Sequence, residues 1–128
     1  MDYEQAAFWV ATSSLVLQAI KMIPRKKRDR SPEDEQALVA LSEAYHATQA
    51  YYSGLARSRD AAARMAIADK WCTVGVLLQK YDRRLANRLD VKSRYWREGA
   101  TWTDTAIQEA KIGLDDIWRE TNLRLQQI

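Results

Sequence analysis

The chain has few of the residues that build turns, disulfides and metal sites. Its 128 residues include four glycines, two prolines, one cysteine and one histidine. So little glycine and proline disfavours a β protein, because strands need frequent turns. A single cysteine, Cys72, excludes an intrachain disulfide and fits a reducing compartment. Since no cysteines and histidines are spaced as metal ligands, and no glycine-rich phosphate loop is present, we predict neither a metal ion nor a cofactor.

The chain has little net charge outside one short basic segment. The formal net charge is +3, and residues 25–30 alone contain five basic residues and one acidic residue. The remainder is close to neutral, which disfavours a uniformly basic nucleic-acid binder. A length of 128 residues suits a single domain with one core.

Helix-forming residues fill the stretches between the few breaks. The pattern predicts helices over residues 2–23, from Pro32 to a break at residues 54–60, over residues 60–89, and from a cap at Thr101 or Thr103 to the C-terminus. The expected fold is all-α, either a four-helix bundle or a three-helix bundle with an N-terminal hydrophobic anchor helix. We divide the chain into a hydrophobic helix (1–23), a basic linker (24–31) and a helical bundle domain (32–128).

Apolar residues in three of these helices recur at alternating spacings of three and four, which is typical of bundle packing. The predicted core stripes are Leu38, Leu41, Tyr45, Thr48, Tyr52 and Leu55; Ile67, Trp71, Val74, Leu78, Tyr81 and Leu85; and Ile107, Ala110, Leu114, Ile117, Thr121 and Leu125.

The second helix has the clearest start. Ser31 is a favourable N-cap, Pro32 suits the first helical position, and three acidic residues follow at the positive end of the helix dipole.

The first helix has two interpretations. Residues 3–23 are long enough for an inner-membrane anchor, and the basic cluster that follows would keep the C-terminal domain in the cytoplasm. The charge-free run, residues 6–20, spans only 15 positions, which is more typical of a buried helix or an oligomer interface in a cytoplasmic protein. Both alternatives stay open from the sequence.

The basic cluster is a topology signal, a phosphate-binding loop or a solvated linker. Its candidate binding residues are Arg25, Lys26, Lys27, Arg28 and Arg30. A second basic region around residues 80–97 adds Arg84 and Arg88, which either form salt bridges with the last helix or bind an anionic partner. Trp96 and Trp102 flank a turn, and either fasten two helices together or form an exposed binding site.

Catalytic chemistry has little support. The lone histidine, His46, is expected at the edge of the core, and Cys72 follows the core residue Trp71. Nothing in their spacing argues that the two meet as a nucleophile and a base. We therefore predict no catalytic residues and a protein that is not an enzyme.

Several stretches resemble a group of uncharacterised small all-helical bacterial proteins. They are residues 38–52, residues 68–89, Tyr95-Trp96 and Trp102-Thr103-Asp104. The resemblance covers most of residues 35–120, and Tyr-Trp, a short spacer and Trp-Thr-Asp form its most specific part. It implies a helical domain, in several members behind one hydrophobic N-terminal helix, and it implies no activity and no site.

The expected function is a non-enzymatic helical interaction or scaffold module that recruits a protein partner or self-associates as a homo-oligomer, with the inner membrane as a second contact through residues 3–23. The alternative is a soluble helical subunit that binds nucleic acid or a nucleoprotein complex, of the kind found in phages and defence systems. Its binding would weaken steeply with salt.

Overall fold

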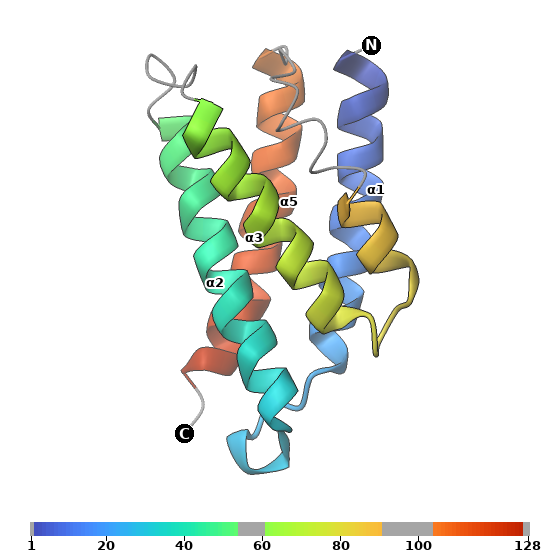
Figure 1. Cartoon of the computed structure of the whole chain (residues 1–128), viewed down its shortest axis with the longest axis vertical. Coiled ribbons are helices and arrows are strands. Elements are labelled where there is room, and N and C mark those ends of the chain that lie inside the picture. The colour runs from blue at the N-terminus through green and yellow to red at the C-terminus, as the bar shows by residue number, and fades with distance from the viewer. Residues whose placement is uncertain (1, 54–60, 91–103, 127–128) are drawn as a thin grey trace.

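The computed structural model describes residues 2–53, 61–90 and 104–126, and every regular element within these ranges is a helix (Figure 1). The all-α prediction is confirmed. The long helices are α1 (Asp2–Met22), α2 (Pro32–Ser53), α3 (Ala61–Leu78) and α5 (Asp104–Leu125). A 3-10 turn, η1 (Lys27–Asp29), lies between α1 and α2, and residues 84–90 are also helical.

The helices pack in two pairs that share one core. α1 lies along α5, α2 lies along α3, and α2 also contacts α5 (Figure 1). The core between them contains Ile20, Leu41, Trp71 and Leu114, none of which is exposed. One buried polar link joins the α2–α3 pair, because the Trp71 Nε1–H donates to Thr48 Oγ1 over 2.9 Å.

The predicted stripes of α2, α3 and α5 face the core at most described positions. The buried members are Leu38, Leu41, Tyr45, Thr48, Ile67, Trp71, Val74, Leu78, Leu85, Leu114, Ile117 and Thr121. Tyr81 is half-buried. The side chains of Tyr52, Leu55, Ile107 and Ala110 lie outside the described set. Leu125 was predicted wrongly: it is 39% exposed, and the neighbouring Arg124 is buried in its place.

The prediction of one continuous helix over residues 60–89 is also wrong. α3 ends at Leu78, whose carbonyl accepts the N–H groups of both Tyr81 and Asp82. The Asp82 carboxylate then accepts the Arg84 N–H over 3.0 Å, and the chain is helical again over residues 84–90. Asp82 thus acts as an N-cap, which its short acidic side chain favours over a position inside a helix.

The second half of α1 is packed into the bundle. Val16, Ala19 and Ile20 are at most 1% exposed, as is Ile23 just beyond the helix. Among the described residues, no helix has both the length and the apolarity that a membrane span requires. The expected anchor over residues 3–23 therefore gains no support there.

Two buried hydroxyl groups, those of Thr12 and Ser13, lie near the middle of α1. Thr12 is not exposed and Ser13 is 4% exposed. Within residues 2–53, 61–90 and 104–126, neither Thr12 Oγ1 nor Ser13 Oγ has a hydrogen-bond partner. Ser13 lies against Gly113 of α5, where a Cβ added to the glycine would be 3.1 Å from the serine side chain. The pairing of α1 with α5 is therefore close at this level but leaves polar atoms unsatisfied.

Gly75 provides a test of the packing of α3 against residues 84–90. A Cβ at this position would lie 2.9 Å from the Leu85 carbonyl oxygen and 3.2 Å from the Ala86 Cα. Since backbone atoms cannot move aside cheaply, we expect Gly75→Ala to lower the free energy of unfolding by about 1–3 kcal/mol, measured by urea denaturation.

Gly113→Ala is the matched control, because both changes raise helix propensity equally. The added methyl at residue 113 meets a serine side chain and not backbone. The decrease in the free energy of unfolding should therefore be smaller for Gly113→Ala than for Gly75→Ala. Equal stability of the two variants would contradict the proposed tight approach at Gly75.

Candidate functional site

The exposed part of the basic cluster is a short loop at one end of the bundle. Arg25, Lys26, Lys27 and Arg28 are all exposed, and Lys27 and Arg28 lie within η1. None of the four forms an ion pair with another residue of the described chain. We call residues 25–28 the basic loop. Its four cations remain available to an external anion.

Arg30 is placed differently from its neighbours. Its side chain is only 1% exposed, and its Nη1–H donates to the Arg124 carbonyl over 3.0 Å. Its Nε lies 3.2 Å from Glu35 Oε1. Arg30 therefore fastens the end of the loop to α5 and α2. The sequence analysis expected Arg30 to bind a partner, but its buried side chain is not accessible to one.

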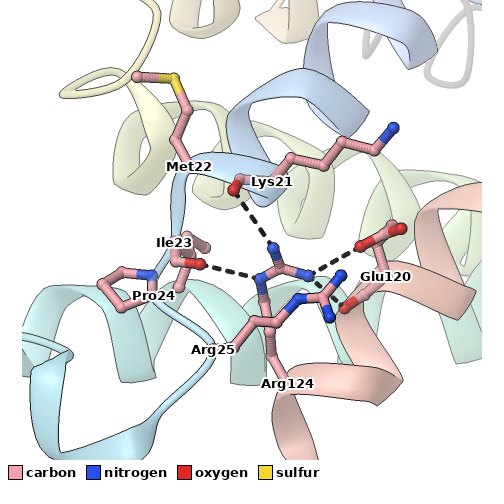
Figure 2. Close-up of a pocket in the computed structure, with 7 residues that line it drawn as sticks. All are labelled: Lys21, Met22, Ile23, Pro24, Arg25, Glu120 and Arg124. Atoms are coloured by element: carbon pink, nitrogen blue, oxygen red, sulfur yellow. Dashed lines mark hydrogen bonds and ion pairs between the residues drawn. The ribbon is translucent and has the colours of Figure 1, made fainter.

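Arg124 fastens the beginning of the same loop. Its Nε–H donates to the Ile23 carbonyl over 3.0 Å, and Nη2 donates to the Lys21 carbonyl over 3.3 Å. Nη1 donates to the carbonyl and the carboxylate of Glu120. Figure 2 shows these bonds converging on one guanidinium. Carbonyls at the end of a helix lack partners within that helix, so Arg124 satisfies the end of α1 from another helix.

A second cluster joins the turn after α3 to the start of α2. Ser31 Oγ accepts the Asp34 N–H, and the Ser31 N–H donates to Asp34 Oδ2, each over 3.1 Å. This reciprocal capping box confirms the N-cap predicted at Ser31. Lys80 Nζ lies 2.8 Å from Asp34 Oδ1, and the Tyr81 hydroxyl donates to the same oxygen.

Asp34 is 3% exposed, yet its carboxylate is well stabilised. Burial by itself raises the pKa of Asp34, but the hydrogen bonds from Lys80, Tyr81 and Ser31 outweigh it and lower that pKa below 3.8. The pKa of Lys80 is raised, chiefly by its bond to Asp34. The pKa of Tyr81 is raised by burial and by the same carboxylate. These groups have a structural role in fixing α2 against the turn at residues 79–83.

Within the second basic region, Lys80 and Arg84 form ion pairs inside the chain, and residues 91–97 lie outside the described residues. Lys80 pairs with α2 and not with the last helix. Arg84 pairs with Asp82 over 3.0 Å, and its hydrogen bond lowers the pKa of that carboxyl. Arg88 is half-buried and is also engaged by other groups. Trp96 and Trp102 lie outside the described residues.

A hollow of about 520 Å³ lies beside the basic loop. Residues 21–25 line one side, and Glu120 and Arg124 of α5 line the other (Figure 2). Its lining brings Arg25 next to the fixed guanidinium of Arg124.

A shallow apolar groove of about 510 Å³ runs between α2 and α3. Val39, Ala40 and Leu77 provide apolar surface, and Val39 is 52% exposed. The remaining lining residues are Glu35, Gln36, Glu43 and Thr73. The groove is therefore acidic at its margins and contains no basic lining residue.

His46 and Cys72 occupy separate settings. His46 is exposed, its Nδ1–H donates to the Ser42 carbonyl over 2.7 Å, and its ring lies edge-on to Trp118 with centroids 4.8 Å apart. Cys72 is half-buried, and its Sγ lies 3.9 Å from Asp90 Oδ1. In residues 2–53, 61–90 and 104–126, no group of three or more His, Cys, Asp or Glu side chains is arranged to hold a metal ion.

Sequence reasoning missed Arg124 and the α2–α3 groove. The Glu120–Arg124 pair, four residues apart, was visible in the sequence. The bonds of Arg124 to the carbonyls of Lys21 and Ile23 were not, because these residues lie about one hundred positions away in the chain. Val39 did carry a signal in the sequence, because this valine follows Leu38 directly and therefore lies outside the predicted apolar stripe of that helix. The structure shows it exposed.

Comparisons with known proteins leave the family open. No protein-family model, no curated protein and no solved structure matches this chain. The resemblance to small helical bacterial proteins therefore stays an expectation, and function is argued from the geometry alone.

Asp34 generates a pH prediction. Because its pKa is lower in the folded protein than in the unfolded chain, its stabilising contribution is present above pH 3.8 and is lost as the pH falls through the lowered value. At neutral pH we expect Asp34→Asn to cost about 1–3 kcal/mol, since it weakens buried bonds to a charged group. The difference in the free energy of unfolding between wild type and Asp34→Asn, measured by urea denaturation, should narrow as the pH falls below 3.8.

Asp116→Asn is the matched control. Asp116 forms a more exposed pair with Arg119, over 3.2 Å, and such pairs contribute little. A stability loss in Asp34→Asn that stays constant down to the acid limit would contradict the assigned role of the carboxylate.

Proposed function

We propose that this protein is a non-enzymatic helical interaction module that holds an amphipathic helix of a partner protein in its α2–α3 groove. The supporting observation is the groove itself, which combines exposed apolar surface with acidic margins. Helices bind such grooves by inserting side chains spaced three and four residues apart.

The apolar part of the groove supplies the contact area. Val39 is 52% exposed although it belongs to a helix whose other face is fully buried. Leu77 is half-buried across the groove on α3, and Ala40 keeps the space between them shallow. Covering these side chains removes apolar surface from water, which is the main driving force for association.

The charged margins define the chemistry of the partner. Glu43 lines the groove with a side chain that is 60% exposed, and its only described ion pair, with Lys70, is a loose 3.8 Å. Glu35 lines the other end and is 37% exposed, but it is paired with Arg30 over 3.2 Å, so Glu43 supplies most of the available negative charge. The fitting occupant is therefore a helix with lysine or arginine beside its apolar stripe, because complementary charge speeds docking and fixes its register.

Val39 is the residue to test. The probe is a synthetic amphipathic helical peptide of about 18 residues, long enough to form stable turns, with leucine on one face and lysine beside it. We expect amide shifts at Val39, Thr73 and Leu77 in two-dimensional NMR. Val39→Ser should weaken binding about fivefold, since it removes a partly buried valine from the contact.

Met65→Ser is the matched control, since Met65 is also 52% exposed but does not line the groove. A peptide with glutamate replacing lysine should bind more weakly. Shifts spread over all helices, or equal losses in both variants, would overturn the proposal. If the free protein is a dimer by sedimentation that Val39→Ser dissociates, a second copy and not a foreign helix fills the groove.

The alternative function is binding of nucleic acid through the basic loop. It is favoured by the four exposed cations of residues 25–28, which Arg124 and Arg30 hold in place from either side. A fixed loop loses little conformational freedom when it contacts phosphates. The loop contains no aromatic residue for base stacking, so contacts would be to the backbone.

Salt dependence tests this alternative. If all four cations contact duplex DNA, the logarithm of the binding constant should fall with the logarithm of salt concentration at a slope of about −3 to −4, measured by fluorescence anisotropy. The double variant Lys26→Gln/Lys27→Gln should reduce that slope by about two, whereas Arg119→Gln on α5 should leave it unchanged. No binding to duplex DNA, or the same salt-dependence slope in Lys26→Gln/Lys27→Gln and in Arg119→Gln, would contradict nucleic-acid binding through the basic loop.

A further inference from the structure

We propose that the hollow between the end of α1 and the last turns of α5 is a binding site for a phosphate group, held by the guanidinium groups of Arg25 and Arg124. The hollow measures about 520 Å³, within the usual size range of small-molecule sites. The proposal is independent of what occupies the α2–α3 groove.

Arg124 provides a guanidinium whose position is already fixed. It is 2% exposed, and four of its five N–H groups donate to Ile23, Lys21 and Glu120. The fifth, on Nη2, has no acceptor among the described residues. A donor that is held rigidly at the wall of a hollow binds an anion with little loss of conformational entropy.

Arg25 provides the second guanidinium. It is exposed and has no ion-pair partner in the described chain. It lines the hollow together with Arg124. Its backbone is also well placed, because the buried Ile23 and the fixed φ angle of Pro24 precede it.

The charge balance of the hollow favours a dianion. Lys21, Arg25 and Arg124 are basic, and Glu120 is the single acidic lining residue. Glu120 is already paired with Arg124 over 2.9 Å. Two positive charges remain in excess, which matches a phosphate monoester carrying about −1.5 to −2 at neutral pH. Guanidinium groups bind phosphate oxygens in a bidentate manner that a lysine cannot reproduce.

The phosphate group can come from two sources with the same chemistry. One is a free phosphorylated small molecule, for which the volume of the hollow leaves room. The other is the terminal phosphate of a nucleic-acid strand that lies along the basic loop. The recognition step is the same in both cases, and only the remainder of the ligand differs.

The test titrates the intact protein with inorganic phosphate and with adenosine monophosphate. We expect saturable shifts of the amides of residues 21–25 and of the Arg124 Nε–H signal in NMR spectra. Arg25→Gln should weaken binding about tenfold, because it removes a charge-assisted bidentate contact. Arg28→Gln, which removes the same charge from the same loop outside the hollow, should change the affinity less than twofold.

Glu120→Gln separates ligand binding from loop folding. The amide oxygen of glutamine can still accept from Arg124, but the negative charge is gone, so phosphate should bind about fivefold more tightly. A purely structural role of Glu120 predicts no gain in affinity. Stability of each variant, checked by urea denaturation, shows whether the fold is retained.

Three outcomes overturn the proposal: no saturable shift with either probe, equal weakening in Arg25→Gln and Arg28→Gln, or weaker binding in Glu120→Gln. The source is decided by comparing a short oligonucleotide with and without its 5′-phosphate. Tighter binding of the phosphorylated strand than of adenosine monophosphate assigns a nucleic-acid end, and the reverse order assigns a free phosphorylated molecule.

Discussion

A single buried guanidinium holds the ends of this bundle together. Arg124 lies in the last turn of α5, yet its donors satisfy the carbonyls of Lys21 and Ile23 at the end of α1. Its own carbonyl accepts from Arg30, just before α2 begins. The end of one helix, the approach to the next and the last helix of the chain thus meet at one residue. The positions of the basic loop and of the adjacent hollow depend on it.

The arrangement resolves a problem that the composition creates. Six consecutive residues, 25–30, contain five positive charges, and such a segment would repel itself into an extended linker. The charge of Arg30 is balanced by Glu35, and its guanidinium donates a hydrogen bond to the Arg124 carbonyl of α5. Asp34, held by Lys80 and Tyr81, fixes the start of α2 on the other side. The remaining cations are therefore displayed from a loop whose ends are both fastened.

The sequence allowed the helices, the Ser31 cap and most of the core stripes to be predicted, because each depends on residues close together in the chain. Leu125 and Arg124 show where that reasoning ends. Apolarity favoured Leu125 for the core, but a buried charge is tolerated when several acceptors surround it. Two of the acceptors of Arg124, the carbonyls of Lys21 and Ile23, lie on residues distant in the chain. The break after Leu78 was missed although Asp82, which accepts the N–H of Arg84 two residues later, is a local signal for a new helix start. The close approach of Gly75 to Leu85 and Ala86, by contrast, arises only on folding.

Because the buried hydroxyls of Thr12 and Ser13 have no partner among the described residues, α1 packs against α5 less favourably there than at its C-terminal end. Burying a hydroxyl without a partner costs about 1–3 kcal/mol in proteins, and that cost is recovered when water enters. At the opposite end, separation from α5 would break the bonds from Arg124 to the carbonyls of Lys21 and Ile23, and would expose Ile20 and Ile23. Separating α1 from α5 therefore costs less free energy beside Thr12 than beside Ile23. We therefore expect the amides of α1 to exchange with solvent faster beside Thr12 than beside Ile20.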